Sequence, residues 1–237
     1  MYMKKLLFFV CVMLTWFHTD ATAKTLVVYY SYTGNCREIV ATLTSQIQAD
    51  VLEIQPAEKG LKYEANNYAL GTQLLNAIKA NPNDAGSYPA IDPVATTLDD
   101  YETIIIITPL WWSQMAANMQ TYLFNYGGQM AGKNVGLIVS SASSSISGVV
   151  ADCKRLVPGG KYFSENLWIN HSNHSNRATL IQAWLTAINY HTVTGISKTK
   201  TTTTAPTPIY DLGGRLLVEE PSKGIYIKNS SFGSKTS

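Results

Sequence analysis

Residues 25–36 read TLVVYYSYTGNC, and this stretch joins an apolar run to a short turn rich in hydroxyl groups. The run over 25–30 has the composition of a buried strand. The apolar residues after the turn have the spacing of a helix, at Ile39, Val40, Leu43 and Ile47. A strand, a turn and a helix in this order present unpaired backbone N–H groups and the positive end of a helix dipole to an anion. The stretch therefore predicts a phosphate-binding turn within an α/β fold.

The side chains of this turn are neutral hydrogen-bond donors. Ser31, Thr33 and Asn35 add donors to those of the backbone, and Gly34 is expected to let the backbone approach a ligand closely. The turn has no Lys or Arg and does not match the pattern G-x-x-x-x-G-K-[ST], which favours a mononucleotide over a nucleoside triphosphate. The alternative is an ordinary helix N-cap, for which Ser, Thr and Asn are the usual residues.

Further apolar runs alternate with helical segments along the chain. The predicted strands after the first are 51–54, 103–108, 134–140 and 162–168, and the predicted later helices are 68–78, 115–126, 149–156 and 176–190. Four consecutive isoleucines at 104–107 indicate a strand buried on both faces, as in a parallel sheet. The alternation predicts a doubly wound, five-stranded parallel sheet with helices on both faces.

Two other loops leave the carboxyl ends of predicted strands, where such sheets bind their ligands. Residues 109–113 read PLWWS, and one of the two tryptophan rings is expected to stack on a flat ligand. The alternative is that both rings pack against neighbouring helices. Residues 141–148 read SASSSISG, a small and hydroxylic loop suited to wrapping a planar heterocycle, with a flexible serine linker as the alternative.

These three loops resemble those of the flavodoxin family, and more narrowly the bacterial flavodoxin-like proteins with Y-F-S-x-T-G-N-T, Y-P-I-W-W and S-G-G-S-G-I-G motifs. The corresponding stretches are 29–36, 108–112 and 141–148, and the resemblance covers about residues 25–190. It implies the flavodoxin-like strand order 2-1-3-4-5 and non-covalently bound flavin mononucleotide (FMN). It places the cofactor against a set of residues in three groups: Ser31, Tyr32, Thr33, Gly34, Asn35 and Cys36 at the phosphate; Pro109, Leu110, Trp111 and Trp112 at the isoalloxazine ring; and Ser141, Ala142, Ser143, Ser144, Ser145, Ser147 and Gly148 closing over the ring.

The resemblance implies electron transfer, or reduction of a small acceptor such as a quinone, with an electron donor and acceptor that the sequence does not name. No side chain is needed as an acid or base, so no catalytic residue is assigned. Two departures from the family motifs are serine or alanine in place of glycines in the third loop and Cys36 in place of threonine. They leave open an alternative, a non-enzymatic exported binding or adapter module whose flavin site has decayed.

Residues 1–23 have the pattern of a secretory signal peptide. Basic residues at 4–5 precede an apolar run over 6–17, and an A-x-A site at 21–23 follows. The alternative is an uncleaved membrane anchor. Cleavage would lower the formal net charge from +2 to +1, because Lys4 and Lys5 leave together with Asp20. A nearly neutral chain offers no electrostatic case for binding nucleic acid, and no later segment predicts membrane insertion. We expect a periplasmic, cell-surface or secreted protein.

The predicted mature chain has three parts: a flavodoxin-like domain over 24–192, a Thr/Lys/Pro-rich linker over 193–208, and a short β tail over 209–237. Residues 209–215 and 224–229 suggest two short strands. This tail resembles the end of the C-terminal sorting domains of Bacteroidetes secreted proteins, which carry I-Y-D-L-x-G-R and P-x-G-I-Y-I-x-N. The resemblance implies contact with export machinery. The alternative is a plain hairpin docked on the main domain.

The two cysteines after residue 23 are not expected to pair, and the two histidines of one loop are not expected to bind a metal. Cys36 and Cys153 are expected on helices that cover opposite faces of the sheet, too far apart for a disulfide. His171 and His174 form H-x-x-H without an evident third ligand, so no metal site is predicted. We expect their loop to cap the last helix through Ser175 or Asn176.

Overall fold

The computed structural model describes residues 24–191 and, further along the chain, the strands within 209–235. The chain divides into two compact units, Met1–Ser197 and Lys198–Ser237, which are described separately. The predicted signal peptide and linker lie outside the described residues. Within the described part of the chain, no helix combines the length and the apolar character needed to cross a bilayer.

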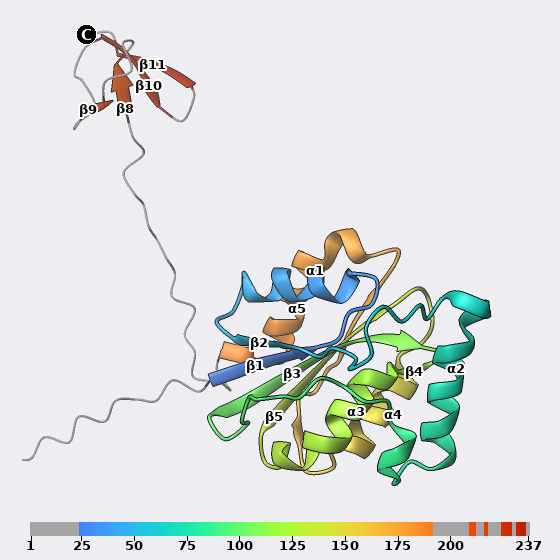
Figure 1. Ribbon diagram of the computed structural model, residues 1–237. Helices are drawn as coiled ribbons and strands as arrows, with labels where there is room; N and C mark the ends of the chain where they lie inside the picture. The colour runs from blue at the N-terminus through green and yellow to red at the C-terminus, as the bar shows by residue number, and fades with distance from the viewer. Residues whose placement is uncertain (1–23, 192–208, 212–215, 218–223, 229–230, 236–237) are drawn as a thin grey trace, which may run out of the picture. The chain divides into compact units, whose positions relative to one another are not determined.

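A single sheet forms the centre of the first unit (Figure 1). Its strands are β1 (Lys24–Tyr29), β2 (Asp50–Glu53), β3 (Tyr101–Trp111), β4 (Gln114–Met115), β5 (Asn134–Ser141), β6 (Lys161–Tyr162) and β7 (Leu167–Asn170). The parallel order is β2-β1-β3-β5-β6, with β7 also paired to β5, while β4 pairs antiparallel with the end of β3. Because β6 and β7 together occupy the place of the predicted fifth strand, the order 2-1-3-4-5 is confirmed.

The predicted strand over 162–168 is interrupted rather than continuous. Tyr162 pairs with Val135 and Leu167 pairs with Ile138, so the chain between the two strands is two residues longer than the β5 segment beside it. The residues between β6 and β7 do not pair with β5 throughout. One of their carbonyl groups, that of Glu165, instead accepts a hydrogen bond from Trp184 Nε1 at 2.9 Å. The apolar pattern did not reveal this break.

Helices cover both faces of the sheet, as predicted (Figure 1). One face carries α1 (Asn35–Thr44) and α5 (Arg177–Ala187), and the other carries α2 (Ala65–Ala80), α3 (Ala117–Tyr126) and α4 (Ser147–Leu156). Short 3₁₀ turns occupy Ala85–Ser87, Gly127–Met130 and His174–Asn176. This arrangement is the doubly wound α/β fold that the sequence predicts.

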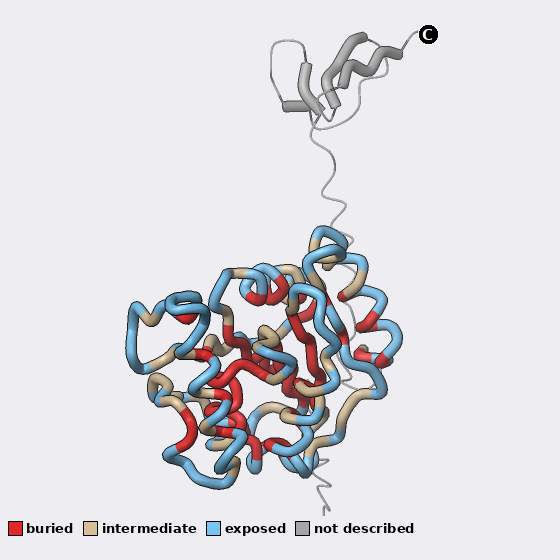
Figure 2. The backbone as a smooth tube through the Cα atoms, turned by 90° about the vertical axis from the view of Figure 1, so that its right-hand side faces the viewer, coloured by how far each residue is buried: buried red, intermediate tan, exposed pale blue. Residues whose placement is uncertain are grey.

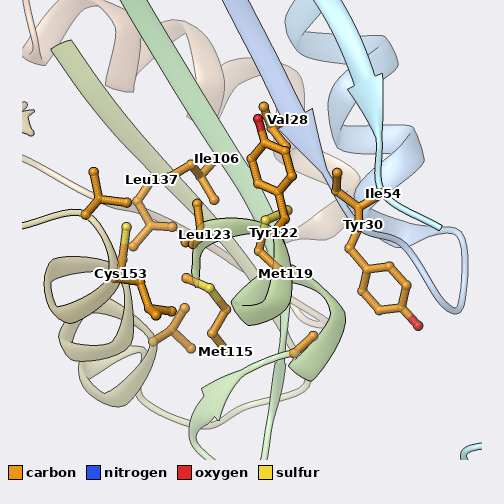
Figure 3. Packing of buried hydrophobic residues seen from close by; sticks show 14 of the residues in the cluster. Val28, Tyr30, Ile54, Ile106, Met115, Met119, Tyr122, Leu123, Leu137 and Cys153 are labelled. Atoms are coloured by element: carbon orange, nitrogen blue, oxygen red, sulfur yellow. The ribbon is translucent and has the colours of Figure 1, made fainter. Parts of the chain in front are cut away.

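The two cores lie on either side of the central strands, whose backbone is buried within the molecule (Figure 2). Side chains at 104–107 are all fully buried, and they alternate between the two cores. Figure 3 shows Val28, Ile106 and Leu137 pointing from three neighbouring strands toward Tyr122 and Leu123 of α3. Burial on both faces explains the continuous isoleucine run.

The two cysteines belong to different cores, as expected. Cys36 packs with α1 and α5, whereas Cys153 packs with α3 and α4, and both thiols are free. Burial raises the pKa of each thiol to about 12. Both side chains are therefore packed core residues.

The second unit contains a four-stranded antiparallel sheet in the order β11-β10-β8-β9. Its strands are β8 (Ile209–Asp211), β9 (Leu216–Leu217), β10 (Gly224–Lys228) and β11 (Ser231–Lys235). The two strands suggested by the sequence contain β8 and β10, and the structure adds β9 and β11. Additional antiparallel neighbours pair backbone groups that a lone hairpin would leave open.

We predict that Cys36 and Cys153 resist alkylation in the native protein. Burial blocks access and the raised pKa keeps both sulfurs as unreactive thiols at pH 8. Iodoacetamide treatment followed by peptide mass mapping should show labelling about 100-fold slower than in guanidinium-unfolded protein. Fast native labelling of Cys36 would mean that the start of α1 opens readily.

Candidate functional site

A pocket of about 1170 Å³ opens at the carboxyl ends of β1, β3, β5 and β7. The three loops singled out in the sequence meet there. The predicted site residues that line it are Ser31, Tyr32, Thr33, Asn35, Cys36, Pro109, Leu110, Trp111, Trp112, Ser141, Ala142 and Ser144. Gly34, Ser143, Ser145, Ser147 and Gly148 are not on its wall. The parallel sheet has thus brought together segments more than one hundred residues apart.

The turn after β1 is shaped as an anion site. Gly34 precedes α1 with a φ of 94°, a left-handed conformation that favours glycine. An added Cβ there would meet no protein atom within 4 Å, so within the described chain the backbone conformation is what favours this glycine. The Arg37 N–H donates to Ser31 Oγ at 3.3 Å, which leaves the serine hydroxyl hydrogen able to donate to a ligand.

The cysteine of this turn faces inward. Cys36 is about 1% exposed and packs in the core below α1, although the residue also contributes to the pocket wall. Arg37 turns to the edge of the sheet, where its Nη2 lies 2.6 Å from Glu53 Oε1. The side chains left to face a ligand at the turn are neutral.

The two tryptophans have different surroundings. The Trp111 ring packs with buried aromatics, its centroid 5.8 Å from that of Tyr30 and 4.7 Å from that of Tyr63. Trp112 is 49% exposed, and both it and Ser113 have left-handed backbone conformations, with φ of 46° and 65°. One ring is therefore held among its neighbours, while the other remains half-exposed at the pocket.

Helix α2 supports the exposed indole. Asn66, Asn67 and Tyr68 form a left-handed turn at its start, with φ between 50° and 60°, and asparagine tolerates this conformation well. The Tyr68 ring meets the Trp112 ring edge-on at a centroid distance of 5.9 Å. A Cβ added to Gly71 would lie 2.8 Å from the Trp112 ring, so the missing side chain makes room for the indole.

The third loop is shorter than predicted. Residues 147 and 148 begin α4, and a Cβ added to Gly148 would lie 2.0 Å from the Ser113 carbonyl oxygen. Gly148 thus permits α4 to pack against the loop that carries the tryptophans. Within the loop, Ser141 Oγ accepts a 2.7 Å hydrogen bond from Trp168 Nε1 and donates to the Ser144 carbonyl at 3.3 Å. These bonds give the loop a defined shape.

A part-buried polar network holds the backbone just after Trp112. The Asp152 carboxylate accepts from the Met115 N–H at 3.0 Å and from Arg155 Nη2 at 3.2 Å. Arg155 also donates to Gln120 Oε1 at 2.8 Å, and Gln120 Nε2 donates to the Met115 carbonyl at 2.8 Å. Both polar groups of the Met115 backbone are therefore fixed by α3 and α4.

The pocket includes residues that the sequence reasoning did not assign to a ligand: Glu38, Tyr63, Glu64, Tyr68, Ser140, Asn170, His171, His174, Ser175 and Arg177. The H-x-x-H spacing of His171 and His174 is a signal in the sequence, but it predicted only a loop that caps the last helix. Asn176 does precede α5, yet its side chain makes no capping hydrogen bond. The tyrosines had no distinguishing pattern, since only the packing of α2 brings them to the pocket.

The charged groups near the pocket are paired. Glu38 Oε2 lies 3.2 Å from Arg177 Nη2, and the Glu64 carboxylate accepts the hydroxyl hydrogen of Tyr32. That hydrogen bond lowers the pKa of Glu64 and raises the pKa of Tyr32. Among the residues that the structure describes, no three His, Cys, Asp or Glu side chains gather as a metal site would require. The arrangement suits an anion at one end and a flat ring at the other.

Comparison with known proteins agrees with this geometry. Residues 24–188 match the family described as Flavodoxin. The fold is similar to a putative flavoprotein from Bacteroides eggerthii, with 25% identity, a TM-score of 0.54, and coverage of 70% of this chain and 98% of that one. The fold is also similar to a putative flavoprotein from Bacteroides uniformis, with 25% identity, a TM-score of 0.54, and coverage of 68% of this chain and 98% of that one.

A third solved structure shows the same fold at lower identity. It is a flavoprotein from Lactobacillus acidophilus in complex with FMN, with 20% identity, a TM-score of 0.52, and coverage of 66% of this chain and 99% of that one. The family match spans the whole sheet and the three loops that form the pocket. The chain therefore belongs to the flavodoxin family.

Proposed function

We propose that this protein binds FMN non-covalently in the pocket and transfers electrons, or reduces a small acceptor such as a quinone. The observation that carries the proposal is the pairing of a neutral anion-binding turn with an open indole face in one pocket. Membership of the flavodoxin family supports it. FMN has the two matching parts, a phosphate and a planar ring.

The turn after β1 fits a phosphate. Ser31 and Thr33 line the pocket with hydroxyl groups, and Asn35 is the first residue of α1. The N–H groups of a first helical turn lack intrahelical partners and point toward a bound anion. Together, the hydroxyls and the helix start would hold the phosphate without a lysine.

The tryptophan loop fits a flat ring. Trp112 has a half-exposed indole held by Tyr68 and Gly71, and a stacked ring would cover its open face. Pro109 and Leu110 line the same side of the pocket, and Ser141, Ala142 and Ser144 approach from the next loop. These residues would orient the isoalloxazine and exclude water from part of it.

Bound FMN would supply the one- and two-electron chemistry, while the protein supplies binding and orientation. The two carboxylates on the pocket wall among the described residues, those of Glu38 and Glu64, are both engaged with other side chains. We therefore assign binding roles and no catalytic residue.

The rim of the pocket favours an uncharged aromatic acceptor. Tyr32, Tyr68 and Trp112 line it and are among the most exposed large apolar side chains of the described chain, at 37%, 50% and 49%. Exposed aromatic faces bind planar molecules without relying on charge.

A binding or adapter module without redox turnover is the second candidate. One observation favours it: Ser143, Ser145, Ser147 and Gly148 stand off the pocket wall, so the third loop encloses a ring less completely than the family motif implies. Absence of both flavin binding and redox turnover would support this candidate.

The proposal includes export. The signal-peptide pattern over 1–23 supports it, and the tail motif over 209–229 suggests contact with an export or sorting machinery. The protein would then act in the periplasm, at the cell surface or outside the cell.

We predict that the double variant Thr33→Ala, Asn35→Ala loses affinity for FMN but not for riboflavin, which lacks the phosphate. Two lost hydrogen bonds to a charged group, at about 1.5–3 kcal/mol each, correspond to at least a ~100-fold rise in the FMN Kd. Quenching of flavin fluorescence measures both constants.

Two further variants complete that experiment. Thr186→Ala removes a hydroxyl that bonds the Gln182 carbonyl on α5, away from the pocket wall, and should leave both constants unchanged. Trp112→Leu should weaken FMN and riboflavin alike, because both contain the ring. If the double variant weakened the binding of FMN and riboflavin equally, the phosphate would not be bound at this turn. Wild-type protein that quenches neither flavin would refute the FMN proposal.

We predict that Gly71→Ala weakens flavin binding without lowering stability. The new methyl group displaces the Trp112 indole, whereas alanine favours a helix over glycine by about 0.8–1.0 kcal/mol. The Kd for FMN should rise about 3- to 10-fold, with an unchanged or higher Tm. Gly128→Ala is the matched control, since a Cβ there meets nothing within 4 Å. An unchanged Kd for Gly71→Ala would show that the indole position does not matter for binding.

We predict that the mature protein begins at Lys24. Cleavage after the A-x-A site removes the basic and apolar leader. The full chain, expressed in a bacterium and recovered from the cell exterior or periplasm, should have the mass of residues 24–237. An intact chain starting at Met1 in the membrane fraction would instead support the uncleaved anchor.

A further inference from the structure

Trp112 and Ser113 form a tight turn between two paired strands. The antiparallel pairing of β3 with β4 runs up to Trp111 and Gln114, so these two residues are the whole connection. Both have positive φ, 46° and 65°, which is the pattern of a two-residue type I′ hairpin turn. Such turns favour Asn-Gly, because larger side chains resist the left-handed conformation. The turn that presents the half-exposed indole therefore needs support from outside itself.

The support reaches the turn through the backbone of Met115 on β4. Met115 lies opposite Leu110. The next pair along carries a ladder hydrogen bond, which the Ala116 N–H donates to the Pro109 carbonyl at 3.2 Å. Because bonded and non-bonded pairs alternate in an antiparallel ladder, the N–H and carbonyl of Met115 point away from β3. The residue is fully buried, so both groups need partners elsewhere in the protein.

Side chains of α3 and α4 supply those partners. Asp152 Oδ2 accepts from the Met115 N–H at 3.0 Å, and Gln120 Nε2 donates to the Met115 carbonyl at 2.8 Å. Arg155 joins the two side chains, because its Nη2 donates to Asp152 Oδ1 at 3.2 Å and to Gln120 Oε1 at 2.8 Å. Its Nη1 also donates to the Tyr88 hydroxyl at 3.1 Å. The whole network lies off the pocket wall.

We infer that Asp152 is a positioning residue for the ring of the ligand: it fixes Met115, and through β4 it keeps the turn at Trp112 left-handed. That the ring is a flavin rests on the proposed function. Without the carboxylate, the Met115 N–H would be buried and unpaired, and the hairpin would move to reach another acceptor. Such a movement relaxes the turn and carries the indole away from the ring it covers. Residues behind the pocket thus set its affinity for a flat ring.

The experiment compares Asp152→Ala with Asp152→Asn in the full chain, with flavin binding measured by fluorescence quenching. Alanine removes the acceptor, so the Kd values for FMN and riboflavin should both rise about tenfold, because the two flavins share the ring. Asparagine keeps an acceptor oxygen for the Met115 N–H and should bind both flavins as the wild type does. Thr121→Ala is the matched control. It removes a hydrogen bond from α3 to the Pro89 carbonyl and should leave both Kd values unchanged.

A second background tests whether the turn itself carries the effect. Ser113→Gly supplies the glycine that a type I′ turn prefers at its second position, and it lowers the cost of the left-handed conformation. In this background Asp152→Ala should raise both flavin Kd values by less than about threefold. A loss of stability alone would give the same rise in both backgrounds. An equal rise in the two backgrounds, or weakened binding of FMN alone, would overturn the inference.

A signal from the flavin-free protein tests the turn without any ligand. The full chain is labelled with 5-fluorotryptophan, and the ¹⁹F resonance of Trp112 is assigned through Trp112→Leu. Asp152→Ala should shift or broaden this resonance. The resonance of Trp184, which belongs to the core on the other face of the sheet, should stay in place and report that the chain is folded.

The outcomes separate this inference from the proposed function. An unchanged Trp112 resonance in Asp152→Ala would overturn the inference while leaving FMN binding intact. If the wild type binds neither flavin, the proposed function fails, and the ¹⁹F comparison still decides whether Asp152 holds the turn. Should Asp152→Ala not fold, Gln120→Met takes its place, because it removes the bond to the Met115 carbonyl and should move the Trp112 resonance as well.

Discussion

Parallel pairing of β1 with β3 holds the two principal loops of the site side by side. Val28 pairs with Ile106 and Tyr29 with Ile107, where β1 ends and β3 continues to Trp111. The phosphate turn therefore begins beside the segment that carries the tryptophans. Both strands are buried on both faces, which prevents slippage because a one-residue shift would exchange the two cores. The pocket is therefore positioned by the buried central strands of the sheet.

Two glycines allow helices to pack closely against the segment that carries Trp112. Gly148 lets α4 touch the Ser113 carbonyl, and Gly71 lets the Trp112 indole lie on α2. The left-handed conformations of Trp112 and Ser113 are uncommon for residues with side chains, and they persist because α4 and α2 pack directly against this loop. The exposed indole is thus a constrained feature of the fold rather than a stray surface residue.

Two pairs of charged side chains hold the backbone and the helices around the pocket. Asp152 and Arg155 bond the backbone beside the tryptophans, whereas Arg177 and Glu38 join the last helix to the first. The second pair also keeps the Glu38 carboxylate 3.9 Å from His174 Nδ1.

The sequence by itself determined the fold class and three loops of the site, because strand–turn–helix periodicity and the isoleucine run at 104–107 are local signals. The strand order followed from the resemblance of those loops to the flavodoxin family. The break between β6 and β7, the packing of Tyr68 on Trp112, and the arrival of His174 beside α1 were decided only by tertiary structure. These features depend on contacts between segments far apart in the chain, and such contacts leave no periodic pattern in either segment.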